Sequence, residues 1–104
     1  MELTEAVYSL TRTFPQEEIY GLTSQLRRAS VSIASNIAEG HGRLTDAQLR
    51  NSLGMARGSL FELQTQIQLA CDMKFLDPKA AEKLLDTGTE VAKLINGLLG
   101  VLEP

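Results

Sequence analysis

The side chains that most often carry chemistry are scarce in this sequence. His41 is the sole histidine and Cys71 the sole cysteine. A metal site needs several ligands at short spacing, and neither residue has a second His or Cys beside it. We therefore predict no metal site and no cofactor. His41 is expected to be a loop residue that faces solvent, and Cys71 a buried thiol that forms no disulfide within the chain.

Two carboxylates, Glu39 and Glu62, are the remaining candidates for acid–base chemistry. They lie 23 residues apart, and no nucleophile or glycine-rich phosphate loop accompanies them. The segment Gly40-His41-Gly42 lacks the strand–loop–helix context of a nucleotide-binding motif. The sequence therefore predicts a protein that is not an enzyme and has no catalytic residues.

Arginines are the third group of interest. The formal net charge is −3, so the chain as a whole does not attract nucleic acid. Between positions 19 and 62, however, five arginines are set against three acids, which leaves +2. Arg43, Arg50 and Arg57 recur every seven residues and should line one helix edge, with Arg27 near the Arg57 end of the hairpin. This row could contact phosphate, and the alternatives are a solvated face or ion pairs between subunits.

A polar stripe is predicted where the second and third helices meet. Its members recur at helical spacing beside apolar rows: Gln25, Arg28, Ser32, Asn36 and Glu39, then Ser59, Glu62 and Gln66. If the hairpin turns near Gly42-Arg43, Arg28 and Ser59 are about equally far from the turn. Glu62 is one turn further on, so we expect an Arg28–Glu62 contact. If buried, this pair would fix the register of the helices more than it would stabilise them; the alternative is that these groups face water.

Hydrophobic spacing divides the chain into four helices. The first is short and ends near Thr13. The second should run from about Gln16 to Glu39, opened by Pro15 and stopped by Gly40 and the glycine after His41. Its apolar stripe is Ile19, Leu22, Leu26, Ala29, Ile33 and Ile37.

The third helix should begin at the capping box Thr45-Asp46-Ala47-Gln48 and fade at Lys74-Phe75. Asp77-Pro78 supplies an N-cap and a first-turn proline for the fourth helix. Both helices repeat apolar residues in heptads. The sequence therefore predicts an all-α fold, a single domain over residues 1–104 that forms an antiparallel up-down four-helix bundle with a short first helix.

The end of the fourth helix is apolar nearly all round. From Val91 to Leu102, eight of twelve residues are aliphatic. A second apolar row, formed by Leu85, Ala92 and Leu99, lies beside the main heptad seam. Such a helix is buried on more than one side, and the three other helices of so small a chain cannot cover it. We predict a homo-oligomer with this second row at the interface.

The sequence also bears on where the protein resides. Nothing resembles a signal peptide, and a lone cysteine suits a reducing compartment. No apolar run reaches the ~18 residues that a membrane span needs. We expect a cytoplasmic protein with no membrane partner.

Two segments carry a family resemblance. They are FPQEEIYGLTSQLRRASVSIASNIAEGHGR, from Phe14 to Arg43, and AxGSLxELxTQ, from Ala56 to Gln66. They resemble the four-helix-bundle family known for members encoded in intervening sequences of bacterial 23S rRNA genes. The resemblance covers nearly the whole chain, and QLRRA followed by SNIAEG is its most distinctive part. It implies an up-down bundle that assembles into a ring-like homopentamer, in a family most of whose members have no established biochemical function.

One branch of this family is similar to the accessory protein of diversity-generating retroelements, which binds a reverse transcriptase and nucleic acid. That branch is strongly basic, whereas this chain is acidic overall. The family's first helix also usually starts earlier than the one expected here. We therefore expect a non-enzymatic, homo-oligomeric scaffold, pentameric by the resemblance. The alternative is a nucleic-acid-binding or reverse-transcriptase accessory protein that uses the arginines at positions 27, 43, 50 and 57.

Overall fold

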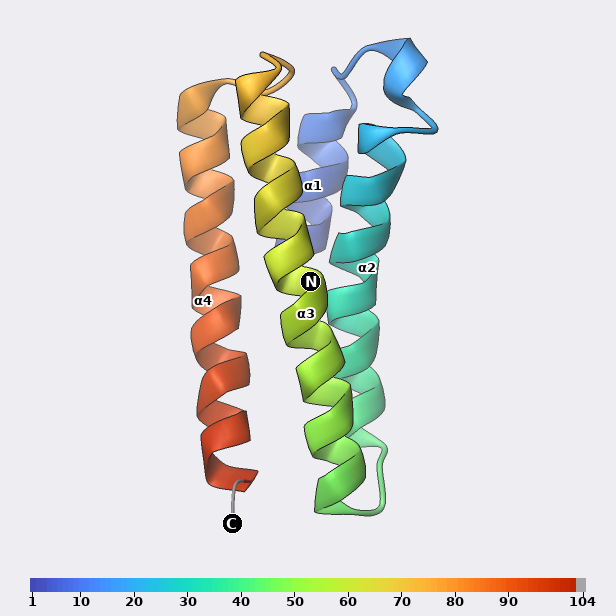
Figure 1. The fold of residues 1–104 in the computed structure, drawn as a ribbon, viewed down its shortest axis with the longest axis vertical. Helices are drawn as coiled ribbons and strands as arrows, with labels where there is room; N and C mark the ends of the chain where they lie inside the picture. The colour runs from blue at the N-terminus through green and yellow to red at the C-terminus, as the bar shows by residue number, and fades with distance from the viewer. Residues whose placement is uncertain (103–104) are drawn as a thin grey trace.

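The computed structural model describes residues 1–102 and confirms the predicted all-α class. Four α-helices, α1 (Glu2–Thr11), α2 (Leu22–His41), α3 (Asp46–Asp72) and α4 (Pro78–Leu102), are joined by short connections, one of which holds the 3-10 helix η1 (Gln16–Glu18). No strand occurs among the described residues. The helices alternate in direction, and α1 covers only the upper part of the bundle in Figure 1.

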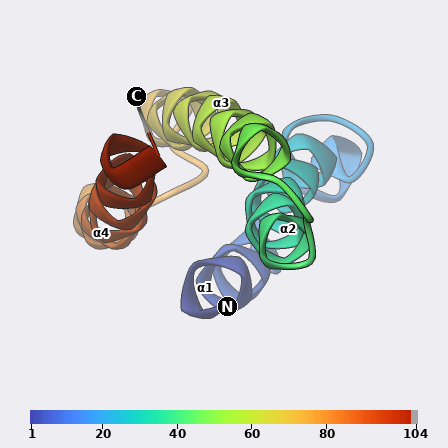
Figure 2. The ribbon, with the colours of Figure 1, turned by 90° about the horizontal axis from the view of Figure 1, so that it is seen from below.

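The end view shows that the helices follow one another around the bundle, so α2 and α4 lie at opposite edges (Figure 2). Within the described residues, every Cα atom of α2 is more than 8 Å from every Cα atom of α4. The central hairpin of α2 and α3 holds most of the core. Its fully buried side chains include Leu26, Ile33, Leu53, Leu60 and Leu63. This apolar seam, rather than intrinsic helix propensity, accounts for most of the stability of helices of this length.

The start of α2 differs from the prediction. The predicted helix from Gln16 is instead a 3-10 turn, and α2 begins after Gly21, whose ψ of −116° lies outside the helical range. The Glu18 carboxylate accepts a hydrogen bond from the Leu22 N–H at 3.2 Å and satisfies one of the free donors of the first turn. Ile19, which was expected in the apolar stripe, therefore lies outside the helix and is 47% exposed.

The end of α2 also differs from the prediction. The helix continues through Gly40 to His41, and Gly42 occupies the C-cap. Gly40 is buried where α2 approaches α3, and a Cβ atom there would lie 2.8 Å from Leu49 Cδ1. Gly40 thus permits close packing of the two helices instead of stopping the first one.

Both ends of α3 are capped, and its start is capped as the sequence predicts. The Thr45 hydroxyl accepts from the Gln48 N–H at 3.2 Å, and the Gln48 side chain accepts from the Leu44 N–H. At the other end, the Phe75 N–H donates to Ala70 O and the Lys74 N–H to Cys71 O, which is the Schellman pattern. Lys74 takes the left-handed conformation that this pattern requires, with φ of 65°.

The last helix begins as predicted, with Asp77 as its cap. The Asp77 carboxylate accepts from the N–H groups of Lys79 and Ala80 at 3.2 and 3.4 Å. Pro78 occupies the first helical position, where its missing N–H has no intrahelical partner to lose. The starts of α3, after Thr45, and of α4, after Asp77, are therefore correctly predicted.

Candidate functional site

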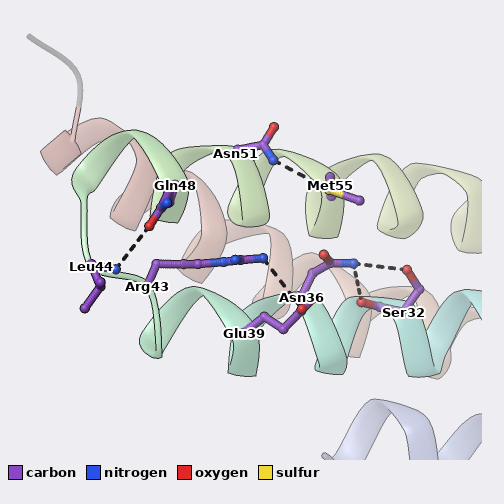
Figure 3. Close-up of polar contacts among 8 residues, drawn as sticks. All are labelled: Ser32, Asn36, Glu39, Arg43, Leu44, Gln48, Asn51 and Met55. Atoms are coloured by element: carbon purple, nitrogen blue, oxygen red, sulfur yellow. Dashed lines mark hydrogen bonds and ion pairs between the residues drawn. The ribbon is translucent and has the colours of Figure 1, made fainter.

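The predicted polar stripe lies along the seam between α2 and α3 but is only partly buried. Ser32 Oγ and Ser59 Oγ are 2.9 Å apart. Asn36 Nδ2 donates to the Ser32 carbonyl at 2.9 Å (Figure 3). Gln66 Nε2 donates to Glu62 Oε1 at 3.2 Å and to Gln25 Oε1 at 3.5 Å. Side-chain hydrogen bonds therefore tie this seam together.

The register of the hairpin is one turn away from the expected one. Ser59 forms its hydrogen bond with Ser32, whereas the sequence predicted Ser59 opposite Arg28. The reason is the longer α2, since its extension to His41 moves the turn from Gly42-Arg43 toward Thr45. Ser32 therefore meets Ser59, and one turn away Arg28 comes level with Glu62, which is the level that the predicted Arg28–Glu62 contact requires.

The expected buried Arg28–Glu62 pair is not present. Both side chains are exposed, and among residues 1–102 no ion pair joins them. They instead line one open pocket of about 430 Å³ together with Ser32 and Ser59. Glu39 is likewise exposed and pairs with Arg43 at 3.6 Å (Figure 3). The charged members of the stripe therefore face water, while Asn36 and Gln66 are its buried members.

Gln66 leaves one polar atom without a partner. Its Oε1 is buried and accepts no hydrogen bond in the described part of the chain. An unsatisfied buried acceptor costs about 1–3 kcal/mol. The stripe is therefore a device for register rather than a source of stability.

The four arginines proposed to contact nucleic acid do not form one surface. Arg27 Nε donates to Thr11 Oγ1 at 2.9 Å, and its guanidinium lies 4.8 Å from the centre of the Tyr8 ring, so it faces α1. Arg43 pairs with Glu39 in the turn.

The other two arginines face the opposite side of the bundle, toward α4. Arg57 Nη1 donates to Asn96 Oδ1 at 3.3 Å, and Arg50 Nη2 donates to the Leu102 carbonyl at 3.0 Å. A cation at that carbonyl also complements the negative end of the α4 dipole. Arg50 and Arg57 line one groove and Arg27 lies on another side of the bundle, and contact of these arginines with nucleic acid stays a prediction.

The apolar row expected at an oligomer interface is mostly covered by the chain itself. Leu99 is buried, and Leu85 and Ala92 are half-buried against the core. The uncovered aliphatic side chains of α4 are instead Leu94, 56% exposed, and Val101, 82% exposed. The sequence contained the signal for this face, since apolar residues at positions 91, 94, 98 and 101 are spaced by 3, 4 and 3.

A second uncovered face was missed altogether. From Ala29 to Ala38 the sequence has no charged residue, although Val31, Ser35 and Ala38 are all exposed. Val31 is 42% exposed. Exposed helix faces usually carry charge, so the run of ten uncharged residues was the signal that this exposed face of α2 is unusual.

The residues that could take part in catalysis or metal binding do not lie together. His41 is exposed and Cys71 is half-buried. Among residues 1–102, no three His, Cys, Asp or Glu side chains gather closely enough to hold a metal ion. Nor is any helix within this range long and apolar enough to cross a membrane.

These features define the class of protein as an up-down four-helix bundle with uncovered helix faces. Within this class, the chain belongs to the 23S rRNA-intervening sequence protein family, because the sequence model of that family matches residues 1–97. The resemblance noted in the sequence is thereby confirmed. None of the curated proteins compared with the chain matches it.

A solved structure with a similar fold is that of a protein with unknown function from the S23 ribosomal protein family of Bacteroides thetaiotaomicron VPI-5482. The two structures agree with a TM-score of 0.84 over 94% of this chain and 92% of that one, at 20% sequence identity. At this identity the likeness establishes the fold alone.

Proposed function

We propose that the protein is a non-enzymatic scaffold that acts as a homo-oligomer, with a ring of five copies as the form that the family resemblance implies. The supporting observation is the apolar strip on α4, formed by Val91, Leu94, Leu98 and Val101. Leu94 and Val101 are exposed, and the other two are half-buried. Covering such a strip gains ~25 cal/mol for each Å² of apolar surface removed from water.

Light scattering after size-exclusion chromatography tests this proposal directly. Across a micromolar concentration series, the mass should be several times the 11.4 kDa of one chain. A Leu94→Glu variant should shift the mass toward the monomer, because it places a charge within the strip. A wild-type chain that stays monomeric at these concentrations contradicts the proposal.

A second candidate function is nucleic-acid binding, alone or as an accessory to a reverse transcriptase. The observation in its favour is a groove of about 510 Å³ between α3 and α4, lined by Arg50 and Arg57. In a ring, symmetry would repeat this pair once per subunit. The net charge of −3 acts against it, since opposite charges on the same ring largely cancel beyond a Debye length of ~8 Å at physiological salt.

The salt dependence of binding separates the two functions. We expect no measurable affinity for generic RNA or DNA at a physiological ionic strength of about 0.15 M. A micromolar complex in that buffer, abolished by Arg50→Glu with Arg57→Glu while the oligomer stays intact, would establish the second function instead. Its log–log salt slope should then fall by about 0.9 for each duplex phosphate that a variant no longer neutralises.

A further inference from the structure

The open pocket of about 430 Å³ between α2 and α3 brings together two opposite charges that do not pair with each other. Most of the side chains that line it are polar: Gln25, Arg28, Ser32, Ser59 and Glu62, with Ala29 as the apolar member. We propose that this pocket binds a small zwitterion, a free amino acid with its carboxylate on Arg28 and its ammonium group on Glu62. The inference does not depend on the proposed self-association, since every lining residue belongs to α2 or α3.

The two charges reach the pocket from different helices at one level. The Ser32–Ser59 hydrogen bond fixes the level of α2 against α3. Arg28 and Glu62 each lie one helical turn from this bond, on the same side of it, because the two helices are antiparallel. Since no ion pair joins the guanidinium to the carboxylate, the pocket presents both charges to one ligand.

The Glu62 carboxylate is held in place by a buried amide. Gln66 is only 5% exposed, and its Nε2 donates to Glu62 Oε1 at 3.2 Å and to Gln25 Oε1 at 3.5 Å. Within residues 1–102 no group donates a hydrogen bond to Glu62 Oε2. One carboxylate oxygen is therefore anchored, and the other can accept from an ammonium group with a charge-assisted hydrogen bond. Gln66 Oε1 is an unused acceptor on the same amide.

Arg28 supplies the donors of the pocket. Its planar guanidinium can bind a carboxylate through two parallel hydrogen bonds, and it stays charged at any physiological pH. The hydroxyl oxygens of Ser32 and Ser59 bond to each other and keep further acceptor capacity. Donors and acceptors thus lie on opposite walls, as the two ends of an amino acid require.

The same charges exclude simpler ligands. A phosphate or another anion bound to Arg28 would also meet the Glu62 carboxylate, and a metal ion bound to Glu62 would meet the Arg28 guanidinium. Either approach brings like charges together and is therefore disfavoured. A ligand that carries both charges satisfies both walls.

A second pocket with opposite charges provides a comparison. Glu2 and Lys83 line a pocket of about 290 Å³ between α1 and α4, and its other lining is mostly apolar: Ala6, Leu10, Ala80 and Leu84, with the hydroxyls of Ser9 and Thr87. Within residues 1–102 no buried amide holds either of these two charges. This pocket therefore offers a matched control for the first one.

NMR titration of the isotope-labelled wild-type chain tests the ligand class. The probes are glycine, β-alanine and γ-aminobutyrate, in which the ammonium and carboxylate groups are progressively further apart. At least one of them should bind saturably in the millimolar range, an affinity expected for two contacts that are open to solvent. Acetate and methylammonium should bind at least about fivefold more weakly, because each makes only one of the two contacts.

The side-chain amide signals of glutamine locate the site. Those of Gln25 and Gln66 should shift during the titration, because these amides lie at the pocket. Those of Gln48 and Gln68, which hydrogen-bond elsewhere on α3, should not shift.

Charge-neutralising variants test the two assigned contacts. Arg28→Gln and Glu62→Gln change exposed positions, and each should weaken binding of the best zwitterion about fivefold. The double variant should show no saturable binding. Lys83→Gln removes a cation from the comparison pocket and should bind as the wild type does, and circular dichroism checks that all variants stay helical.

Three results would overturn the assignment. The first is the absence of saturable shifts with all three zwitterions. The second is binding of acetate or methylammonium as tight as that of the best zwitterion, since one charge would then suffice. The third is a loss of affinity in Lys83→Gln as large as in Arg28→Gln. The mass of the oligomer is measured separately, so none of these results affects the proposed self-association.

Discussion

At the end of α3, Lys74 adopts a backbone conformation that favours glycine. Its φ of 65° is left-handed, and a side chain there carries a steric cost of about 1–2 kcal/mol. Lys74→Gly removes this cost but adds freedom to the unfolded chain. We expect a net gain of about 0.5–1 kcal/mol in the free energy of unfolding, measured by urea denaturation at one protein concentration.

A matched lysine in a regular helix provides the control. Lys83 is exposed within α4, and Lys83→Gly should lower the free energy of unfolding by about 1 kcal/mol. Equal effects of the two substitutions would contradict a strained Lys74.

The exposed positions of Arg28 and Glu62 give a second prediction at this scale. Since both face solvent and no ion pair joins them, a double-mutant cycle with alanine should give a coupling energy below ~0.5 kcal/mol. A buried pair would instead lose about 3–5 kcal/mol on each single truncation. Denaturation of the four chains at one concentration measures the coupling, and a large value would restore the pair that the sequence suggested.

Residue-level signals in the sequence were reliable where a side chain acts locally. Thr45 and Asp77 cap their helices as expected, because a cap depends only on the next three residues. The Arg27–Thr11 contact and the exposure of Arg28 were not predictable, because they depend on how distant helices come into register.

At the scale of elements, the helices were predictable from apolar spacing, but neither end of α2 was. Pro15 is compatible with a helix start, but the flexible Gly21 and the Glu18 side chain delay that start by six residues. Conversely, Gly40 has the sequence of a helix stop yet lies inside α2, because the close approach of Leu49 requires it there. Only tertiary packing distinguishes these uses of glycine.

Two glycines in helices allow a direct test of this distinction. A Cβ atom at Gly58 of α3 would meet nothing within 4 Å, whereas one at Gly40 would lie 2.8 Å from Leu49 Cδ1. Gly58→Ala should therefore raise the free energy of unfolding by about 0.5–1 kcal/mol through higher helix propensity. Gly40→Ala should gain clearly less or lose stability, since Leu49 must move. Equal gains in urea denaturation would show that the α2–α3 contact does not need glycine.

At the scale of the whole molecule, the bundle was predictable and its free surfaces were not. Heptad spacing indicated that α4 is apolar on two sides, but the row expected to be free contains the buried Leu99. The choice depends on the rotation of α4 about its own axis, which packing against α3 sets. The exposed positions of Val31, Ser35 and Ala38 on α2 likewise depend on how that helix is rotated against α1 and α3, although the uncharged run from Ala29 to Ala38 was a signal for them.

Assembly should couple to stability. A partner that binds only the folded chain raises its melting temperature with concentration. We therefore expect the Tm of the wild-type chain to rise across a hundredfold concentration range, and that of Leu94→Glu to stay constant. Scanning calorimetry measures both, and a constant wild-type Tm would indicate that the subunits do not stabilise one another.

The short α1 has one more consequence, which concerns local opening. Because α1 covers only the upper part of the bundle, the C-terminal half of α4 lies beside α3 alone, held at its end by the Arg50–Leu102 hydrogen bond (Figure 1). Helix ends with few neighbours open and reclose most often. The C-terminal half of α4, which carries the apolar strip, should therefore fray most readily in an isolated subunit, and under the proposed self-association its amide hydrogens should exchange more slowly in the oligomer than in the monomer.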